Sequence, residues 1–273
     1  MALIENISEE ALVKMVSILA DTAMVAITVI SVVCAFLAYF YQKNRNKKTV
    51  ACELALYYAD VILKENRFLN NVFKGAGVSA HIRAVLKDMN SLQHFDSNEL
   101  KGFLEEAGTD PDEFKRKLNE IDGSVIVNCR RLHDESANAF IEFDEETGEQ
   151  RIRNESILRT DLTNSIYDLL NHLEWFGMNC RYRLADEKLV YQSLHETYLS
   201  MIWMLYPYIC FINSEGKDKR YTNAIWLFFK WRKRMRKISK KTQRKKKLLT
   251  KLADRIQKLA DNIRAKEFSG RRL

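Results

Sequence analysis

Apolar residues along the chain first form one continuous run. The 21 residues from Thr22 to Gln42 carry no charge, with Asp21 before them and Lys43 after them. At about 1.5 Å per residue, a helix of this length spans roughly 31 Å, the thickness of a bilayer's hydrocarbon core. Since lipid offers the backbone no hydrogen-bonding partner, we predict a transmembrane helix over 22–42. A soluble core helix is seldom apolar for so long, and a cleaved signal peptide begins with basic residues, whereas this chain begins acidic.

After the run, apolar residues recur at spacings of three and four, which predicts a mainly α-helical domain over 49–236. The chain holds only 2 prolines and 9 glycines, which favours long helices over a strand-rich fold. The expected helices, after a short polar break that follows the span, are Thr49–Lys74, Ser79–Gln93, Ser97–Glu106, Pro111–Asn138, Glu155–Phe176, Asp186–Ile212, Tyr221–Lys237 and Lys240–Lys266. Residues 140–153 resemble either a small β-hairpin or an irregular loop.

Local signals place several helix ends. Asp96 and Asp110 suit N-cap positions, and Pro111 suits the first turn that follows Asp110. Gly177 is expected to end its helix, and Pro207 to kink the next one.

Charge is distributed unevenly. The net charge is +8, but residues 217–273 hold 22 of the 44 basic residues and only 4 of the 36 acidic ones, giving that segment +18 and the remainder −10. Basic residues also follow the apolar run, at Lys43, Arg45, Lys47 and Lys48, whereas residues 1–21 hold four acidic residues and a single lysine. The positive-inside bias therefore predicts a single-pass protein of the inner (plasma) membrane, with 1–21 outside and the C-terminus in the cytoplasm.

The sequence contains no recognisable catalytic motif. It therefore predicts no catalytic residue, no metal site and no cofactor, and hence no enzyme. Phosphate-binding glycine loops and the paired-histidine zinc motif are absent, and the five cysteines form no CxxC pair. The cysteines are expected to be reduced thiols of a cytosolic protein. His172 is expected to be a buried, hydrogen-bonded side chain. A hydrolase without a recognisable motif is retained as an alternative.

The densest charge lies near the C-terminus, where residues 230–247 hold twelve cations and no acid. This basic patch comprises Lys230, Arg232, Lys233, Arg234, Arg236, Lys237, Lys240, Lys241, Arg244, Lys245, Lys246 and Lys247. Trp226, Phe229 and Trp231 lie beside it as candidate interfacial aromatics. Two partners suit this combination: anionic lipid headgroups at the inner leaflet, or nucleic acid whose bases stack on the rings. A third interpretation is that the rings belong to the core and the charges merely solvate a helix.

The segment 237–273 is predicted to be a basic amphipathic helical tail. Its residues Leu249, Leu252, Ile256, Leu259 and Ile263 repeat at 3-4-3-4 spacing. That pattern is a coiled-coil seam of two heptads, too short to be stable alone. Packing on the body and self-association through 249–263 are both open.

Several of these features resemble a bacterial family of single-pass membrane proteins whose helical cytosolic region is catalogued only as a domain of unknown function. The likeness is carried by Leu169–Glu174, Asp186–Glu187, Trp203 and Pro207–Ile209, and it covers about two thirds of the chain. The resemblance implies a membrane-anchored helical interaction or effector module, part of a bacterial defence system in some members. The basic extension after Trp231 goes beyond the family pattern.

Overall fold

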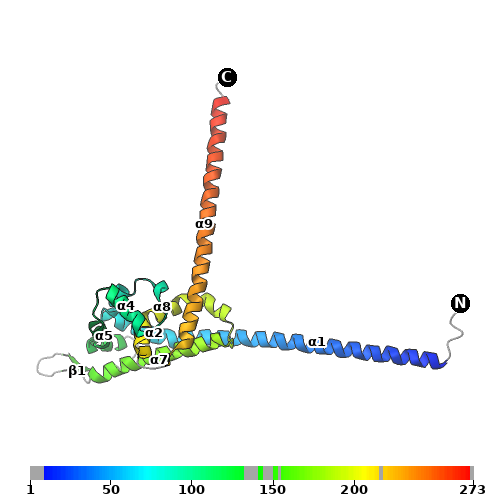
Figure 1. Ribbon diagram of the computed structural model, residues 1–273, viewed down its shortest axis with the longest axis horizontal. Helices are drawn as coiled ribbons and strands as arrows, with labels where there is room; N and C mark the ends of the chain where they lie inside the picture. The colour runs from blue at the N-terminus through cyan, green and yellow to red at the C-terminus, as the bar shows by residue number, and fades with distance from the viewer. Residues whose placement is uncertain (1–8, 132–140, 144–149, 153–154, 215–217, 271–273) are drawn as a thin grey trace.

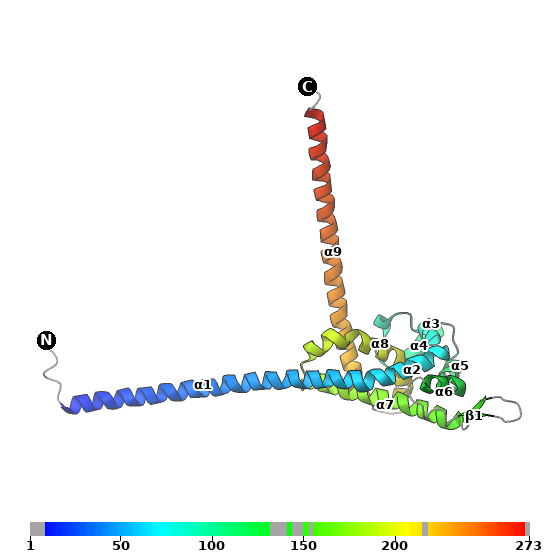
Figure 2. The ribbon, with the colours of Figure 1, turned by 180° about the vertical axis from the view of Figure 1, so that it is seen from behind.

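The computed structural model describes residues 9–131, 141–143, 150–152, 155–214 and 218–270, with side chains described over 13–131, 155–214 and 218–258. Two long helices, α1 (Glu9–Tyr57) and α9 (Thr222–Gly270), project from a compact helical body. They leave it in crosswise directions, and both leave from the same end of the body (Figures 1 and 2).

Helix α1 contains the apolar run, and it continues without interruption through Lys43–Lys48 into the body. The predicted polar break is therefore wrong. Lysine and arginine are good helix formers, and the stretch holds no glycine or proline, so nothing interrupts the backbone hydrogen bonds. Throughout the apolar run every side chain is exposed, and among the described residues this is the one helix long and apolar enough to cross a membrane.

Where α1 enters the body, a π-helical turn (Tyr58–Ile62) joins it to α2 (Leu63–Gly75). Both Tyr58 and Ile62 are fully buried. Helix α2 ends at Gly75, close to the predicted end at Lys74, and Gly77, with φ of 73°, occupies the left-handed position that precedes α3.

The next segment departs from the prediction of one helix over 79–93. It comprises α3 (Val78–Val85), a 3₁₀ turn (Met89–Ser91) and α4 (Ser97–Glu106). Leu86 and Leu92 are both buried, and the chain leaves the helical path between them. The predicted cap of α4 is confirmed, because Asp96 Oδ1 accepts from the Glu99 N–H at 3.0 Å. The Glu99 carboxylate in turn accepts from the three N–H groups of residues 93–95.

Asp110 and Pro111 open α5 (Pro111–Asn119) as predicted, and Asp110 accepts from the Glu113 N–H at 3.0 Å. Over the described residues, the helix predicted for 111–138 is two helices, because the chain breaks after Asn119 and restarts as α6 (Gly123–Arg131), with Ile121 buried between them. The rest of that prediction, 132–138, lies outside the described residues. Strands β1 (Ile141–Phe143) and β2 (Gln150–Ile152) pair antiparallel within 140–153. The acidic turn that would join them lies outside the described residues.

The centre of the body is formed by α7 (Glu155–Arg181), α8 (Glu187–Ser214) and the first turns of α9. Phe176, Tyr198 and Trp231, one from each helix, are fully buried and packed together, with ring centroids 5.0–6.1 Å apart. Pro207 lies inside α8 and is buried. Gly177 lies inside α7 instead of ending it, so that prediction is wrong. A side chain there would meet the backbone of α9, at 2.7 Å from the Asn223 carbonyl.

Helix α9 is a single helix where two were expected, because Ile238 and Ser239 continue it without a break. Its exposed part therefore projects as a straight rod beyond the body (Figure 2).

Candidate functional site

The candidate site is the basic patch on α9, and the body fixes it at its root. Ala224, Leu227, Phe228 and Trp231 are buried at helical spacing and hold the first turns of α9 in the core. Trp231 is fully buried, so its prediction as an interfacial aromatic is wrong. Buried apolar residues therefore continue into the start of the charged segment. In the sequence, the cations of the outer face that alternate with them obscure their spacing.

Helix α7 caps the N-terminus of α9. The Glu174 carboxylate accepts from the backbone N–H of Asn223 at 3.0 Å and of Ala224 at 2.9 Å, and from the Asn223 side-chain amide at 2.7 Å. These are orphan donors of the first helical turn, where a negative charge also stabilises the helix dipole. The carboxylate therefore fixes where α9 begins.

A second carboxylate, Glu187 at the start of α8, secures the next turns. Its Oε1 accepts from the Trp231 indole N–H at 2.7 Å, and its Oε2 lies 3.1 Å from Lys230 Nζ. Arg234 lies 3.6 Å from the same carboxylate and stacks over Tyr191 at 3.9 Å from the ring centroid. Two of the twelve patch cations are thus engaged in holding α9 to α8.

Arg232 is a third structural cation. It is 9% exposed, and its guanidinium donates to the carbonyl oxygens of Met89 at 2.8 Å and Leu92 at 2.6 Å. Burial and the neighbouring Arg236 lower the pKa of Arg232, although an arginine stays charged at neutral pH. The assignment of Arg232 to a binding surface is therefore wrong, because the side chain stabilises the loop between α3 and α4.

The remaining nine patch cations are exposed along the rod. Lys233, Arg236, Lys237, Lys240, Lys241, Arg244, Lys245, Lys246 and Lys247 all lie on exposed positions of α9. An exposed edge of apolar side chains accompanies them. Ile238, Leu249, Leu252 and Ile256 are each more than half exposed, and at about 100° per residue they fall within about 60° of one another around the helix. Leu259 and Ile263, the rest of the predicted seam, lie outside the described side chains.

The two other candidate aromatics are half-buried and already covered by cations. Lys230 lies 4.7 Å and Arg181 5.9 Å from the Trp226 ring centroid, and Arg232 lies 4.9 Å from that of Phe229. Neither ring is open to a base or an acyl chain on the face that these cations cover. What the site offers a partner is therefore dense charge beside a narrow apolar edge.

The loop between α7 and α8 places this site next to the end of the apolar run. Asp186 N donates to the Lys47 carbonyl at 3.0 Å, and Arg183 and Leu184 line a shallow groove with Tyr39, Gln42 and Lys43 of α1. Lys47 is five residues beyond Gln42, or about 8 Å along the helix. Glu187 follows Asp186 and binds α9, so the start of α9 lies close to the end of the apolar run.

One polar cluster lies apart from the basic patch, at the π-helical turn. Tyr57 Oη shares a hydrogen bond with His172 Nδ1, and His172 Nε2 lies 3.4 Å from Glu65 Oε1. Burial, opposed by His172 and assisted by Asp168, raises the pKa of Glu65. The hydrogen bond expected of His172 is confirmed, but its side chain is 30% exposed and not buried as expected. The sequence did not indicate its partners, because Tyr57 and Glu65 lie more than a hundred residues away. In the part of the chain that the structure describes, no three His, Cys, Asp or Glu side chains could together hold a metal.

Compared with known proteins, the chain matches no family model, no curated protein and no solved structure. The resemblance drawn from the sequence therefore remains a hypothesis.

Proposed function

We propose that this protein is a single-pass, membrane-anchored helical module whose α9 rod lies along the inner leaflet and binds anionic lipid headgroups. The main observation in support of this proposal is the direction of α9 relative to α1. Helix α9 leaves the body crosswise to α1, from the end of the body that faces the apolar run (Figure 1). If α1 crosses the bilayer, a helix crosswise to it runs along the membrane surface and not away from it.

The loop that joins α7 and α8 supports this placement. Tyr182 and Leu184 are more than half exposed there, and Arg183 stands between them. Aromatic, apolar and cationic side chains together favour the interfacial layer of a bilayer. Arg183 and Leu184 lie beside Tyr39, Gln42 and Lys43 of α1, where that layer would begin, so the body would rest on the membrane near the start of α9.

The charge on α9 then suits the surface that it meets. Basic residues near an anionic leaflet contribute about 1 kcal/mol each, and the attraction acts within a Debye length of about 8 Å. Four engaged lysines would therefore supply about 4 kcal/mol. Because α1 already holds the protein at the membrane, this energy is needed only to orient α9. The exposed edge of Ile238, Leu249, Leu252 and Ile256 suits shallow insertion between headgroups.

The test places the full-length protein in nanodiscs of neutral lipid or of lipid containing phosphatidylglycerol. A donor dye at Thr242→Cys, with the exposed thiols Cys34 and Cys52 replaced, reports energy transfer to an acceptor on lipid headgroups. We expect greater transfer in the anionic discs and a loss of the difference at high salt.

A charge-matched pair of variants sharpens the test. Neutralising four rod lysines (Lys240, Lys241, Lys245 and Lys246 to Gln) should abolish the excess transfer in anionic discs. Neutralising four exposed body lysines (Lys64, Lys74, Lys87 and Lys101 to Gln) removes the same charge and should leave it intact. Equal transfer in both lipids would refute the proposal. Tight RNA or DNA binding by the rod in anionic discs near 150 mM salt would favour the nucleic-acid alternative.

A further inference from the structure

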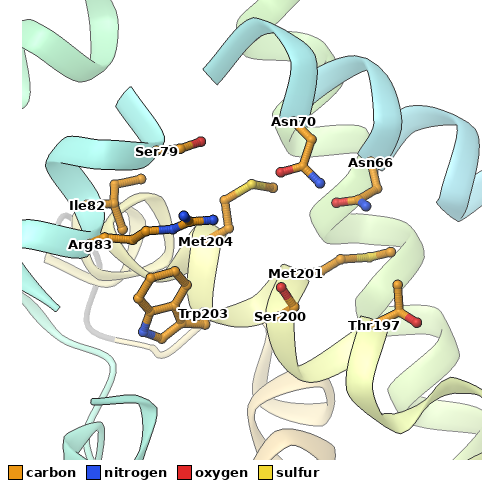
Figure 3. A pocket seen from close by; sticks show the side chains of 10 residues that line it. All are labelled: Asn66, Asn70, Ser79, Ile82, Arg83, Thr197, Ser200, Met201, Trp203 and Met204. Carbon is orange, nitrogen blue, oxygen red and sulfur yellow. The ribbon is translucent and has the colours of Figure 1, made fainter. Parts of the chain in front are cut away.

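A groove of basic side chains, here called the basic groove, runs along α9 where the helix leaves the body. Five of its six described lining residues are cations and none is acidic: Phe229, Arg232, Lys233, Arg236, Lys237 and Lys240. Cations do not gather in this way in the cleft between α2, α3 and α8, where Arg83 is the one cation among ten described lining residues (Figure 3). The basic groove therefore suits a ligand with several negative charges.

Arg232 places a buried charge at this groove. Its guanidinium donates to the carbonyl oxygens of Met89 and Leu92, and among the described residues no carboxylate forms an ion pair with it. The carboxylates whose charge reaches Arg232 are those of Asp88 and Glu99, and both already accept hydrogen bonds from backbone N–H groups. A buried charge is weakly screened, so Arg232 raises the positive potential of the groove without having to touch a ligand.

The other four cations follow one another along the exposed side of the helix. Within the described part of the chain, Lys233, Arg236, Lys237 and Lys240 have no acidic partner. They span about 10 Å along the helix axis. Lys233 with Lys237, and Arg236 with Lys240, are like-charge pairs at i,i+4, a spacing that destabilises a helix. An anion long enough to span the row would relieve this repulsion.

The basic groove and the apolar edge of α9 face in different directions. At about 100° per residue, the centre of the groove lies roughly 180° around the helix from Ile238, with which Leu249, Leu252 and Ile256 align. If that edge lies between lipid headgroups, the groove opens toward the cytoplasm. An anion in solution would reach it there, whereas a lipid headgroup would not.

We infer that the basic groove binds a soluble chain of linked phosphates, such as inorganic polyphosphate or the triphosphate of a nucleotide. Arg236 would contact the chain through its planar fork, and the three lysines would contact it as point charges. At roughly 10–15 Å³ for each water-sized position, the groove's volume of about 390 Å³ holds several phosphate groups. The one ring of the lining, Phe229, is already packed by Arg232 and Phe95, so no base is expected to stack there.

The experiment uses the full-length protein in micelles of an uncharged detergent, and isothermal titration calorimetry near 150 mM salt measures binding. The micelles hold no anionic lipid, so the result is separate from that of the nanodisc test. Tripolyphosphate and ATP should have dissociation constants within about threefold of each other, because the base makes no contact. AMP, with one phosphate, and citrate, whose carboxylates are too close together to span the row, should each bind at least about tenfold more weakly, as the loss of a charge-assisted contact implies.

Two charge-matched variants locate the site. Arg236→Gln combined with Lys237→Gln should weaken tripolyphosphate binding at least about tenfold. Lys251→Gln combined with Lys258→Gln removes the same charge from an exposed stretch of α9 and should change binding by less than about twofold, because Lys251 lies about 16 Å beyond Lys240, or two Debye lengths.

The inference is overturned if tripolyphosphate does not bind, if citrate or AMP binds as tightly as tripolyphosphate, or if both double variants lose the same affinity. ATP binding more than about tenfold tighter than tripolyphosphate would also overturn it, because the site would then recognise a nucleoside. The same holds if a single strand of about ten nucleotides binds more tightly than tripolyphosphate, since nucleic acid would then be the ligand.

Discussion

Replacing Gly177 with alanine tests how α9 is held. An added methyl carbon would lie 2.7 Å from the carbonyl carbon and oxygen of Asn223 and 2.8 Å from Ala224 N. Ordinary carbon contacts need about 3.5–4.0 Å, so α7 and α9 must separate by about 1 Å. All three neighbours are backbone atoms, which no side-chain rotation can move aside.

The free energy of unfolding should fall by about 1–3 kcal/mol. Overpacking of this kind costs about 1–3 kcal/mol, and weakening the Glu174 cap adds about 1 kcal/mol. The better helix propensity of alanine offsets about 1 kcal/mol of that sum.

Urea unfolding of the full-length protein in micelles measures the change. Gly102→Ala is the matched control, since a side chain there meets no atom within 4 Å. Because Gly102 is a helical glycine with open space around it, the free energy of unfolding should rise by about 0.5–1 kcal/mol in Gly102→Ala. If Gly177→Ala were as stable as the wild type or as Gly102→Ala, the close approach of α7 and α9 would be refuted.

Three further predictions concern single side chains. Glu187→Ala should destabilise the protein by about 2–4 kcal/mol in urea unfolding, because it leaves the indole N–H of Trp231 buried and unpaired, whereas Glu187→Gln should cost less by keeping that bond. Asp110→Ala should cost about 1 kcal/mol by removing the cap of α5, read from the same unfolding curves. Since burial raises the pKa of Glu65, its contribution to stability is fully present below its unfolded pKa and is lost as pH rises through the folded pKa. Glu65→Gln should therefore gain stability relative to the wild type as pH rises above the unfolded pKa of about 4.3, and a difference that does not change with pH would contradict the raised pKa.

Sequence reasoning worked where the signal was local. The caps at Asp96 and Asp110 involve partners three residues away, so the residue types alone determined them. The apolar run that became part of α1 was equally local, since it needs only length and an absence of charge.

The sequence failed where a distant partner decides the outcome. Gly177 carries the same local signal whether it ends a helix or lets another helix approach, and only the position of Asn223 separates the two. Trp231 and Arg232 lie in a segment whose cations dominate its composition, so their burial depends on contacts with Glu187, Met89 and Leu92.

The unbroken path of α1 has a mechanical consequence. Helix α1 is unbroken from Glu9 to Tyr57 and so has no flexible joint between the apolar segment and the body. When the body rotates about the helix axis, the apolar segment must therefore rotate with it. If α1 crosses a bilayer as proposed, the direction in which α9 points around the axis of α1 would be set by which face the apolar segment turns toward its lipid or protein neighbours. Inserting two glycines between Asn44 and Arg45 would uncouple the two motions.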